Sequence, residues 1–290
     1  MRNSEVRVII INFNAGDALL RSVASVLSTR EPLSLVVADN ASSDDSCEKL
    51  RSLHGGNQRL EIVENSSNMG FSRAVNALAM QAEEPYLLIL NPDCELYPGT
   101  LAALRQALEQ DQDAALASPR MVDEKEQTLK GTLRTFPSPW KAVMTATGLA
   151  HLGSMLPFLR GVELQDPGGE EVKRVDAVSG ACMMMRSDRF RLLNGLDEAY
   201  EMHFEDLDLM YRIQKNHWFC LYAPAARAYH MPGISSRSRP TWVHFHKHRG
   251  MQRFFSKHQA SEYSPLSRGL FHSMVWVHFL LTLPQVWLNR

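Results

Sequence analysis

The sequence predicts an α/β fold with a mostly parallel central sheet flanked by helices. Three observations predict it: short apolar runs rich in β-branched residues recur, stretches with helical spacing follow them, and polar clusters stand where several of the runs end. Strands that alternate with helices form a parallel sheet covered on both faces. The composition, 44% apolar and 22% charged over 290 residues, is that of an ordinary globular protein.

Strands and helices alternate regularly in the first part of the chain. The expected strands are Val6–Ile11, Leu33–Ala38, Leu60–Glu64, Tyr86–Leu90 and Ala114–Ser118. The expected helices are Asp17–Ser28, with Asp17 as its N-cap, Ser42–Leu53, Phe71–Ala82 and Gly99–Gln110. Ligands of parallel sheets bind at the carboxyl ends of the strands. The polar residues that fall there are Asn12, Asn14, Asp39, Asn40, Asn91 and Asp93.

The pattern is less regular in the second part of the chain. Met121–Lys173 holds several prolines and a loose apolar stretch, and it is expected to form an insertion or an acceptor-side segment. Strands are expected at Val175–Arg186 and Trp218–Tyr222, and short helices at Asp188–Asn194 and Leu207–Asn216.

Charge and cysteine usage exclude several classes of protein. The net charge of −1 argues against a nucleic-acid partner. The four cysteines lack the spacing of a metal or redox motif, so free thiols in a reducing compartment are expected. The N-terminal residues do not have the pattern of a signal peptide, and a cytoplasmic protein is therefore expected.

The C-terminal part combines a basic stretch with an apolar one. Between Gly233 and Arg268 a single acid, Glu262, stands among seven basic residues: Arg237, Arg239, Lys247, Arg249, Arg253, Lys257 and Arg268. Gly269–Leu288 is apolar and rich in Trp and Phe, with a break expected at Pro284. This favours a helix lying at a membrane interface, and the alternative is a helix packed on the protein itself. The chain is expected to divide into residues 1–258 and a C-terminal segment, 259–290.

Asn91-Pro92-Asp93 follows the apolar run YLLIL. Pro92 lacks a backbone donor and ends the strand, so that the flanking side chains project at its end. A carboxylate there could hold a divalent cation that neutralises a diphosphate, since Mg²⁺ needs only one or two protein carboxylates. The alternative is an ordinary turn, because Asn-Pro and Asp are common turn formers.

An acidic cluster, Glu205, Asp206 and Asp208, stands where a helix is expected to begin. Carboxylates this close repel one another, but the dipole at a helix N-terminus favours negative charge. They could cap the helix, with Asp206 as N-cap. Alternatively, one could act as general base for a hydroxyl group while another binds the molecule that carries it. The local sequence leaves both interpretations open.

Further polar groups have a structural and a functional interpretation each. His230 follows a strand and turn that could bring it to Asp93, where an imidazole could complete a metal shell, although a lone histidine is more often structural. Asp39 could accept hydrogen bonds from a ribose or a pyrimidine base, or it could shape a turn. Gly70 precedes a helix with Arg73 one turn in, which could contact phosphate, but the spacing of a phosphate-binding loop is missing.

The histidines at alternate positions in the basic stretch could bind a metal. Because no carboxylate or cysteine accompanies them, a solvated or headgroup-facing surface is expected instead. They are His244, His246 and His248.

Six sequence blocks occur in order between residues 6 and 258: VIIINFN, VVADNASSD, NSSNMGFSRAVN, LLILNPDCELYPGTL, VSGACMMMR and NGLDEAYEMHFEDLDLMYRI. Together they resemble the signature blocks of family 2 glycosyltransferases, and most of all those of bacterial rhamnosyltransferases. The resemblance implies a GT-A fold, with a Rossmann-like sheet, a nucleotide-sugar half at about residues 1–120 and an acceptor half at about 121–258. The C-terminal segment is then a helical extension.

The resemblance also implies an inverting transfer and the residues that carry it. The expected donor contacts are Asn12, Asn14, Asp39, Asn68, Gly70, Phe71, Arg73, Asn76 and Asn91. A divalent metal, Mg²⁺ or Mn²⁺, is expected at Asp93 and His230. Asp206 is the expected catalytic base, and the expected acceptor contacts are Glu205, Asp208, Gly180 and Ala181.

Two departures from the family pattern stand out. Asn91 takes the place of an aspartate that many members carry, which leaves a strict need for metal open. Met202-His203 stands where many members have Phe-Phe or Phe-Leu before the acidic pair, which affects the expected acceptor pocket.

The implied function is sugar transfer in the synthesis of a bacterial cell-surface glycan. The first choice of donor is dTDP-L-rhamnose, and the acceptor is expected to be lipid-linked or a polysaccharide. The enzyme would work at the cytoplasmic face of the inner membrane, with a homodimer left open. A nucleotide-sugar-binding scaffold without turnover is the alternative, which the acidic cluster disfavours. A nucleotidyltransferase is disfavoured because NFNAGDA is not a Gly-rich loop with Arg or Lys.

Overall fold

The computed structural model describes residues 5–154, 156, 158, 161–231 and 239–288. The strands are β1 (Val6–Asn12), β2 (Leu33–Asp39), β3 (Leu60–Glu64), β4 (Tyr86–Leu90), β5 (Cys94–Leu96), β6 (Ala114–Val122), β7 (Leu133–Arg134), β8 (Glu163–Leu164), β9 (Lys173–Val175), β10 (Ala177–Val178), β11 (Cys182–Arg186) and β12 (Phe219–His230). The helices are α1 (Asp17–Leu27), α2 (Ser46–His54), α3 (Phe71–Ala79), α4 (Thr100–Gln110), α5 (Pro139–Ala146), α6 (Ser187–Leu192), α7 (Glu205–Lys215), α8 (Pro240–His258) and α9 (Pro265–Leu288). Two short 3₁₀ helices are η1 (Leu149–Ser154) and η3 (Ala260–Glu262).

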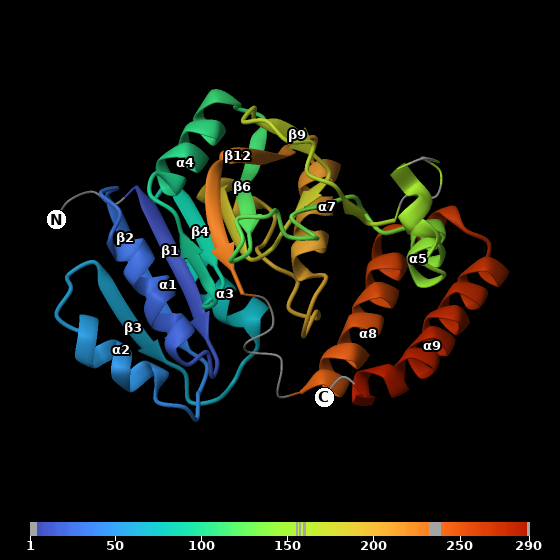
Figure 1. Ribbon diagram of the computed structural model, residues 1–290, viewed down its shortest axis with the longest axis horizontal. Coiled ribbons are helices and arrows are strands. Elements are labelled where there is room, and N and C mark those ends of the chain that lie inside the picture. Colours follow the sequence, from blue (N-terminus) through green and yellow to red (C-terminus); the bar gives the residue numbers. More distant parts are fainter. Residues whose placement is uncertain (1–4, 155, 157, 159–160, 232–238, 289–290) are drawn as a thin grey trace.

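The central sheet has the strand order β3-β2-β1-β4-β11-β6-β12-β5, with β9 paired to β12 (Figure 1). The strands β3, β2, β1 and β4 are parallel, and β6 is parallel to β12, while β11 runs antiparallel between β4 and β6. The predicted mostly parallel sheet flanked by helices is therefore confirmed. A separate sheet, β10-β7-β8, forms beside it.

Both faces of the sheet are covered by helices because the strands are apolar on both sides. On β1, Val8 and Ile10 join a core cluster with residues of α1, α2 and α4. Ile9 and Ile11 face the other way and join a cluster with residues of α3, α6 and α7. Near-continuous apolar runs such as VRVIII are typical of such doubly covered strands.

Several element boundaries differ from those predicted, each for a local reason. The helix expected from Ser42 begins at Ser46, because the Ser42 and Asp44 side chains make hydrogen bonds within the preceding loop. The N-cap of α1 is Gly16, with φ of 57°, and the predicted cap Asp17 is the first helical residue. The single strand expected at Val175–Arg186 is divided into the last residue of β9 and the whole of β10 and β11.

The strand expected at Trp218–Tyr222 is longer and extends to His230. It is interrupted by a register shift between Ala223 and Arg227, and it pairs first with β6 and then also with β5. A bulge of this kind re-aims the strand. The expected return of the chain to the sheet edge beside Asp93 is therefore confirmed.

Met121–Lys173 is not structureless, although its residues 155, 157, 159 and 160 lie outside the described part. It contributes the end of β6, the strands β7 and β8, and α5. Arg134 of β7 lies opposite Ala177 of β10, so this segment is joined to the main domain by strand pairing.

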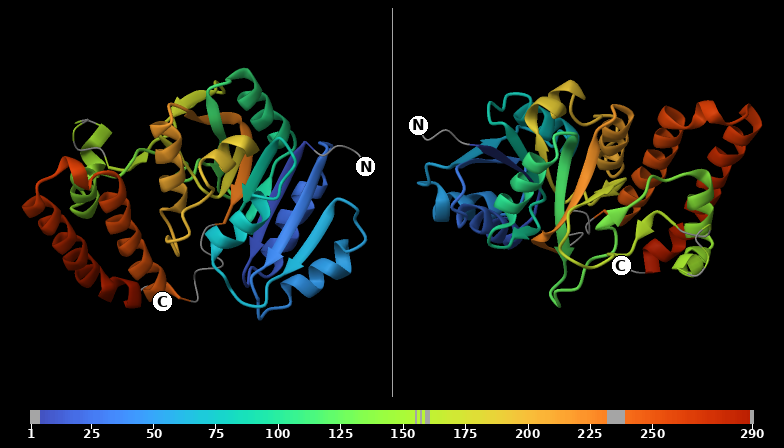
Figure 2. Two further views of the ribbon diagram at one scale, coloured as in Figure 1. Left: turned by 180° about the vertical axis from the view of Figure 1, so that it is seen from behind. Right: turned by 90° about the horizontal axis from the view of Figure 1, so that it is seen from above.

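The helices α8 and α9 lie side by side next to the sheet domain (Figures 1 and 2). Phe255 of α8 packs against Phe271 and Val275 of α9, and Ala142 of α5 contacts the same cluster. The predicted break at Pro284 is wrong, because α9 continues through it to Leu288. A proline costs the helix one hydrogen bond, and this one lies near the helix end. The predicted division at residue 258 falls between these paired helices and stays a prediction.

Candidate active site

The carboxyl ends of β1 and β2 hold a rigid polar cluster. Asn12 and Asp39 lie opposite each other in register, and Asn12 Nδ2 donates to Asp39 Oδ1 over 2.7 Å. The backbone N–H and the hydroxyl of Ser42 also donate to the Asp39 carboxylate, at 3.0 and 2.6 Å. Asn14 Oδ1 accepts the backbone N–H of Ser43 at 2.7 Å. Asp39 is thus held in one orientation, with the buried Asn12 behind it and Asn14 shaping the adjoining loop.

The predicted phosphate-side loop lies beside this cluster. Gly70 precedes α3 with φ of 86°, a conformation that favours glycine. Asn68 Oδ1 accepts the Gly70 N–H at 2.9 Å, and Asn40 Nδ2 donates to the Gly70 carbonyl at 3.3 Å. Phe71 opens α3 against the core, and Arg73 stays exposed, 3.5 Å from Glu198. The loop therefore joins the ends of β2 and β3 to a helix N-terminus.

The structure gives Asn76 a role different from the predicted donor contact. Its amide exchanges two hydrogen bonds with the backbone of Leu196, both at 2.9 Å, and donates to Glu198 at 3.0 Å. A Cβ atom at Gly195 would lie 2.3 Å from Asn76 Oδ1. Asn76 is therefore a buried clamp that ties α3 to the loop before α7.

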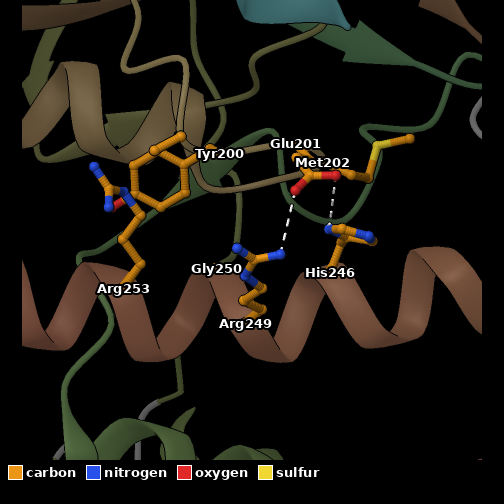
Figure 3. A pocket seen from close by; sticks show the side chains of 8 residues that line it. Tyr200, Glu201, Met202, His246, Arg249, Gly250 and Arg253 are labelled. Atoms are coloured by element: carbon orange, nitrogen blue, oxygen red, sulfur yellow. Dashed lines mark hydrogen bonds and ion pairs between the residues drawn. The ribbon is translucent and has the colours of Figure 1, made fainter.

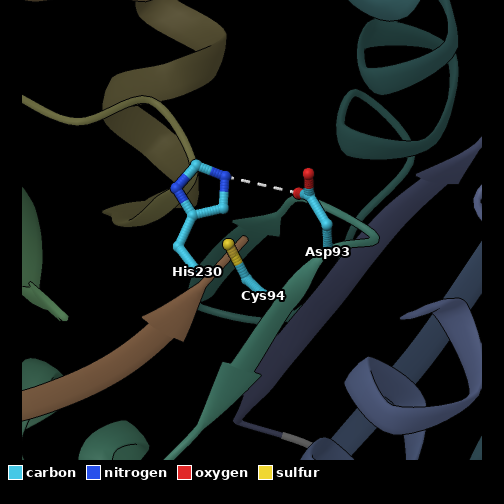
Figure 4. A group of neighbouring side chains, drawn as sticks. All are labelled: Asp93, Cys94 and His230. Atoms are coloured by element: carbon cyan, nitrogen blue, oxygen red, sulfur yellow. Dashed lines mark ion pairs between the residues drawn. The ribbon is translucent and has the colours of Figure 1, made fainter. Parts of the chain in front are cut away.

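Asp93, Cys94 and His230 form a compact group at the junction of β5 and β12 (Figure 4). His230 lies opposite Cys94 in the antiparallel pair, and this places its Nε2 atom 3.4 Å from Asp93 Oδ1. The three possible ligand atoms lie within 4.8 Å of one another. Asp93 Oδ1 is buried and has no hydrogen-bond partner in the described part of the chain. A buried carboxylate oxygen without a partner is costly unless a cation or a donor satisfies it.

The chemistry of these side chains fits a divalent metal held by two of the three residues. Carboxylate and imidazole ligands suit Mg²⁺ and Mn²⁺ better than sulfur does. In the absence of a metal ion, burial raises the pKa of the Cys94 thiol well above its usual value. Asp93 and His230 are therefore the pair that could hold the ion.

A short chain of contacts links this metal motif to the acidic cluster. The backbone N–H of Asn91 donates to the carbonyl of Ala181 over 2.8 Å. The neighbouring Gly180 touches Asp206, because a Cβ atom at Gly180 would lie 2.5 Å from Asp206 Oδ2. The turn between β10 and β11 thus connects both groups, and glycine is required for its close approach to the carboxylate.

The start of α7 presents the acidic pair in an unusual backbone setting. His203 and Phe204 have φ of 63° and 73°, and Phe204, instead of Asp206, is the N-cap. Glu205 and Asp206 are the first two helical residues. Asp206 is 9% exposed and forms an ion pair with Arg134. Positive φ at two residues without a glycine stores strain, a feature that is frequent at functional sites.

Glu205 and Asp206 have opposite tendencies to ionise. Burial, and then the charge of Asp206, raises the pKa of Glu205 to about 8. Burial also disfavours the charged form of Asp206, but the Arg134 guanidinium outweighs it and holds the pKa of Asp206 below its usual value. At neutral pH the pair therefore carries one proton, on Glu205, and one negative charge, on Asp206. Neighbouring groups with separated pKa values are typical of acid–base sites.

Asp208 does not lie where an acceptor could reach it, and its predicted acceptor contact is corrected. Its side chain is fully buried and accepts hydrogen bonds of 2.7 Å each from Arg212, Lys257 and His258. Burial opposes its ionisation, but these three partners lower its pKa far below the usual value. Asp208 therefore fastens α7 to the end of α8.

A pocket of about 130 Å³ lies between α8 and the loop before α7 (Figure 3). Its polar lining includes Glu201, which forms ion pairs with Arg249 at 3.2 Å and with His246 at 3.7 Å. His246 and His248 are buried, so the predicted solvated histidine surface is wrong. His246 packs on Trp242, and His248 Nε2 lies 2.9 Å from His278 Nδ1 of α9. His248 is thus buried between α8 and α9, whereas His246 is buried against the loop before α7.

The sequence model of "Glycosyl transferase family 2" matches residues 7–162, which is more than half of the chain. The chain belongs to glycosyl transferase family 2. A relative from Mycobacterium tuberculosis, N-acetylglucosaminyl-diphospho-decaprenol L-rhamnosyltransferase, is 27% identical over 80% of this chain and 78% of its own. The rhamnosyltransferase WbbL of Escherichia coli K12 is 23% identical over 80% of this chain and 86% of its own. The protein is therefore a glycosyltransferase with rhamnosyltransferase relatives.

Solved structures of glycosyltransferases share the fold of this family 2 member. The mannosyltransferase PcManGT from Pyrobaculum calidifontis, in complex with GDP-Man and Mn²⁺, superimposes with a TM-score of 0.60 at 16% identity over 99% of this chain and 74% of that chain. GalNAc-T7, solved with UDP, GalNAc and Mn²⁺, gives a TM-score of 0.59 at 16% identity over 94% of this chain, which spans about half, 54%, of that chain. The GT-A fold that the sequence resemblance implied is confirmed.

Two residues of this transferase's site were not predicted from the sequence. Cys94 follows Asp93 directly, and its position in the NPDC block is the signal that could have placed it beside the metal pair. Arg134 lies in the irregular insertion, and no pattern in the sequence connects it to Asp206. Its contact depends on the pairing of β7 with β10.

We expect Asp93→Asn and His230→Ala each to weaken Mn²⁺ binding by at least about tenfold, because each removes one of two protein ligands. Calorimetric titration of the purified protein with MnCl₂ measures this without requiring turnover. Cys94→Ala is the matched control and should bind Mn²⁺ as the parent protein does. Equal affinity of the parent and Asp93→Asn would contradict the assignment.

Proposed function

We propose that this protein is an inverting rhamnosyltransferase that transfers L-rhamnose from dTDP-L-rhamnose to a lipid-linked or polysaccharide acceptor. The observation that carries the proposal is the position of Asp206. It forms an ion pair with Arg134 and lies against Gly180, in the turn that also bonds to the metal motif through Asn91. The rhamnosyltransferase relatives support the choice of sugar. The site of action would be the cytoplasmic face of the inner membrane, and the homodimer stays a prediction.

The donor would lie along the carboxyl ends of β1, β2 and β4. Asp39, held by Asn12 and Ser42, offers fixed carboxylate oxygens to a ribose or a base N–H. The loop with Asn68, Gly70 and Arg73 lies next to it at the start of α3, where an anion is favoured. A divalent metal held by Asp93 and His230 would neutralise the diphosphate, with Asn91 beside it.

Transfer then needs one proton to move as one bond forms and another breaks. Asp206 accepts the proton of the acceptor hydroxyl, the hydroxyl oxygen bonds to the anomeric carbon, and the bond from that carbon to the diphosphate oxygen breaks. The nucleoside diphosphate leaves with the bonding electrons, and attack from the opposite face inverts the configuration. Gly180 and Ala181 would line the acceptor, and the neutral Glu205 can donate a hydrogen bond to it.

We expect Asp206→Asn to lower kcat by about 100- to 10,000-fold, since it removes the base without changing the shape of the side chain. Donor affinity should stay nearly unchanged, because Asp39 and the metal pair are intact. Release of dTDP from a panel of nucleotide-sugars, with and without Mn²⁺, measures turnover, and calorimetry measures donor binding.

Asp188→Asn, at an exposed aspartate of α6, is the matched control and should keep the parent kcat. Wild-type turnover of Asp206→Asn would show that another group is the base. Binding of nucleotide-sugars without any release of dTDP by the parent protein would favour the scaffold instead.

We further propose that α9 and the basic residues of α8 contact an anionic membrane surface. The exposed residues Leu266, Leu270, Val277, Leu281 and Leu288 follow one another at intervals of four or seven positions and form one apolar face of α9. Arg249, Arg253 and Lys257 form ion pairs with Glu201, Asp197 and Asp208 of the sheet domain. The basic side chains of α8 and α9 without an ion pair in the described part are therefore Lys247 and Arg268, while Arg237 lies outside the described residues. No helix in the described part is long and apolar enough to cross a bilayer. An apolar face flanked by cations fits a helix lying in the interface.

Co-sedimentation with phosphatidylglycerol vesicles tests this surface. We expect the parent protein to bind these vesicles and to bind phosphatidylcholine vesicles weakly, because anionic headgroups attract the cations. The double variant Leu270→Glu/Leu281→Glu should lose most of the binding. Leu53→Glu/Leu192→Glu, which changes two similarly exposed leucines of α2 and α6, is the matched control and should bind normally. Equal sedimentation of both double variants would rule the surface out.

A further inference from the structure

Arg134 reaches the acidic pair from a segment distant in the sequence. It ends β7, in the insertion, and its pairing with Ala177 directs the side chain towards the start of α7. Its Nη2 atom donates to Asp206 Oδ2 and to the carbonyl of Val178, and its Nε atom donates to the same carbonyl at 3.1 Å. The two bonds to the Val178 carbonyl fix the orientation of the guanidinium that contacts the Asp206 carboxylate.

The Asp206 carboxylate is confined from two sides. The Arg134 guanidinium contacts Oδ2, and on the Gly180 side there is no room for even a Cβ atom, which would lie 2.5 Å from the same oxygen. The backbone N–H of Leu207 donates to Oδ1 at 2.8 Å. The side chains of Arg134 and Asp206 are 18% and 13% exposed, so water screens their attraction little.

The charged groups around Asp206 come from three elements. Arg134 comes from β7, His203 and Glu205 belong to the segment of Asp206 itself, and Lys247 of α8 faces His203. Arg134 is the cation that bonds to the carboxylate in the described part of the structure. With this cation removed, two adjacent carboxyl groups in a dry setting would share a proton, and neither would be reliably ionised.

We propose that Arg134 is a positioning residue that fixes the orientation of the Asp206 carboxylate and holds it in the ionised form. The inference rests on the proposed function, in which Asp206 takes the proton of the acceptor hydroxyl. Arg134 touches neither reacting atom in this account, and it acts through the carboxylate. The short β7–β10 pairing, which joins the insertion to the sheet domain, places the Arg134 side chain next to Asp206.

The pH profile of kcat tests the proposal with three variants. In Arg134→Gln, the apparent pKa on the acidic side of the pH profile, which we call the acidic limb, should rise by at least about one unit. Below that pKa, kcat should fall about tenfold for each unit of pH. Donor affinity should stay within about twofold of the parent value, because no donor contact changes. Arg134→Lys keeps a cation without the planar fork, and it should restore part of the parent profile.

Arg120→Gln is the matched control. Arg120 is an equally buried arginine of β6, paired with Asp166 at 2.8 Å and remote from the acidic pair. It should lose stability as Arg134→Gln does, measured as melting temperature, and keep the parent position of the acidic limb. An unchanged acidic limb in Arg134→Gln overturns the proposal, and so does an equal shift in Arg120→Gln.

Failure of the proposed function can be told apart from failure of this inference. If the parent protein transfers no sugar, the function is wrong, but the carboxylate of Asp206 can still be followed by infrared difference spectra between each protein and its Asp206→Asn variant. A carboxylate band that persists at pH 6 in the parent protein and weakens in Arg134→Gln supports the inference. A band that is the same in both contradicts it.

Discussion

The structure of the site depends on the adjacent carboxyl groups of Glu205 and Asp206, which are largely removed from water. One guanidinium, that of Arg134, pairs with the Asp206 carboxylate. Burial makes two charges there unfavourable, and Arg134 makes one charge favourable on Asp206. Three further features of the site keep these carboxyl groups in place. Gly180 lets the turn approach the carboxylate, the positive φ values of His203 and Phe204 set the start of α7, and Asp208 fastens α7 to α8.

The fold brings the donor side and the base together through the sheet. Parallel strands end at one edge, which places Asp39 beside Asn12 and brings the Asn91-Pro92-Asp93 motif to the same side. The bulged strand β12 then returns along β5 and supplies His230. The bond from Asn91 to Ala181 connects the metal motif to the turn that touches Asp206. Asp93 and His230 can together supply the metal ligands in this chain, in which Asn91 takes the place of an aspartate that many family members carry.

The sheet and the polar residues at its edge could be predicted from the sequence, because local patterns determine them. The alternation of apolar runs with helical stretches predicted the sheet, and the polar residues after the strands predicted which side chains gather at its edge. The predicted element boundaries were wrong where side chains form hydrogen bonds that replace those of a helix, as Ser42 does before α2. Contacts between distant segments could not be predicted. Arg134 and Asp206 bond to each other although they are 72 residues apart in the sequence. The burial of Asp208 likewise depends on Lys257 and His258 of α8.

The central claim is that the acidic pair shares one proton, held by Glu205, while Asp206 is ionised. Carboxyl ¹³C NMR of the protein labelled at Asp and Glu measures this directly, with Glu205→Gln and Asp206→Asn spectra for assignment. The account predicts that the Glu205 resonance titrates near pH 8 and that the Asp206 resonance keeps its ionised shift from pH 9 down to below pH 5. An Asp206 resonance at the protonated shift at pH 7, or a Glu205 resonance ionised at pH 6, would contradict it.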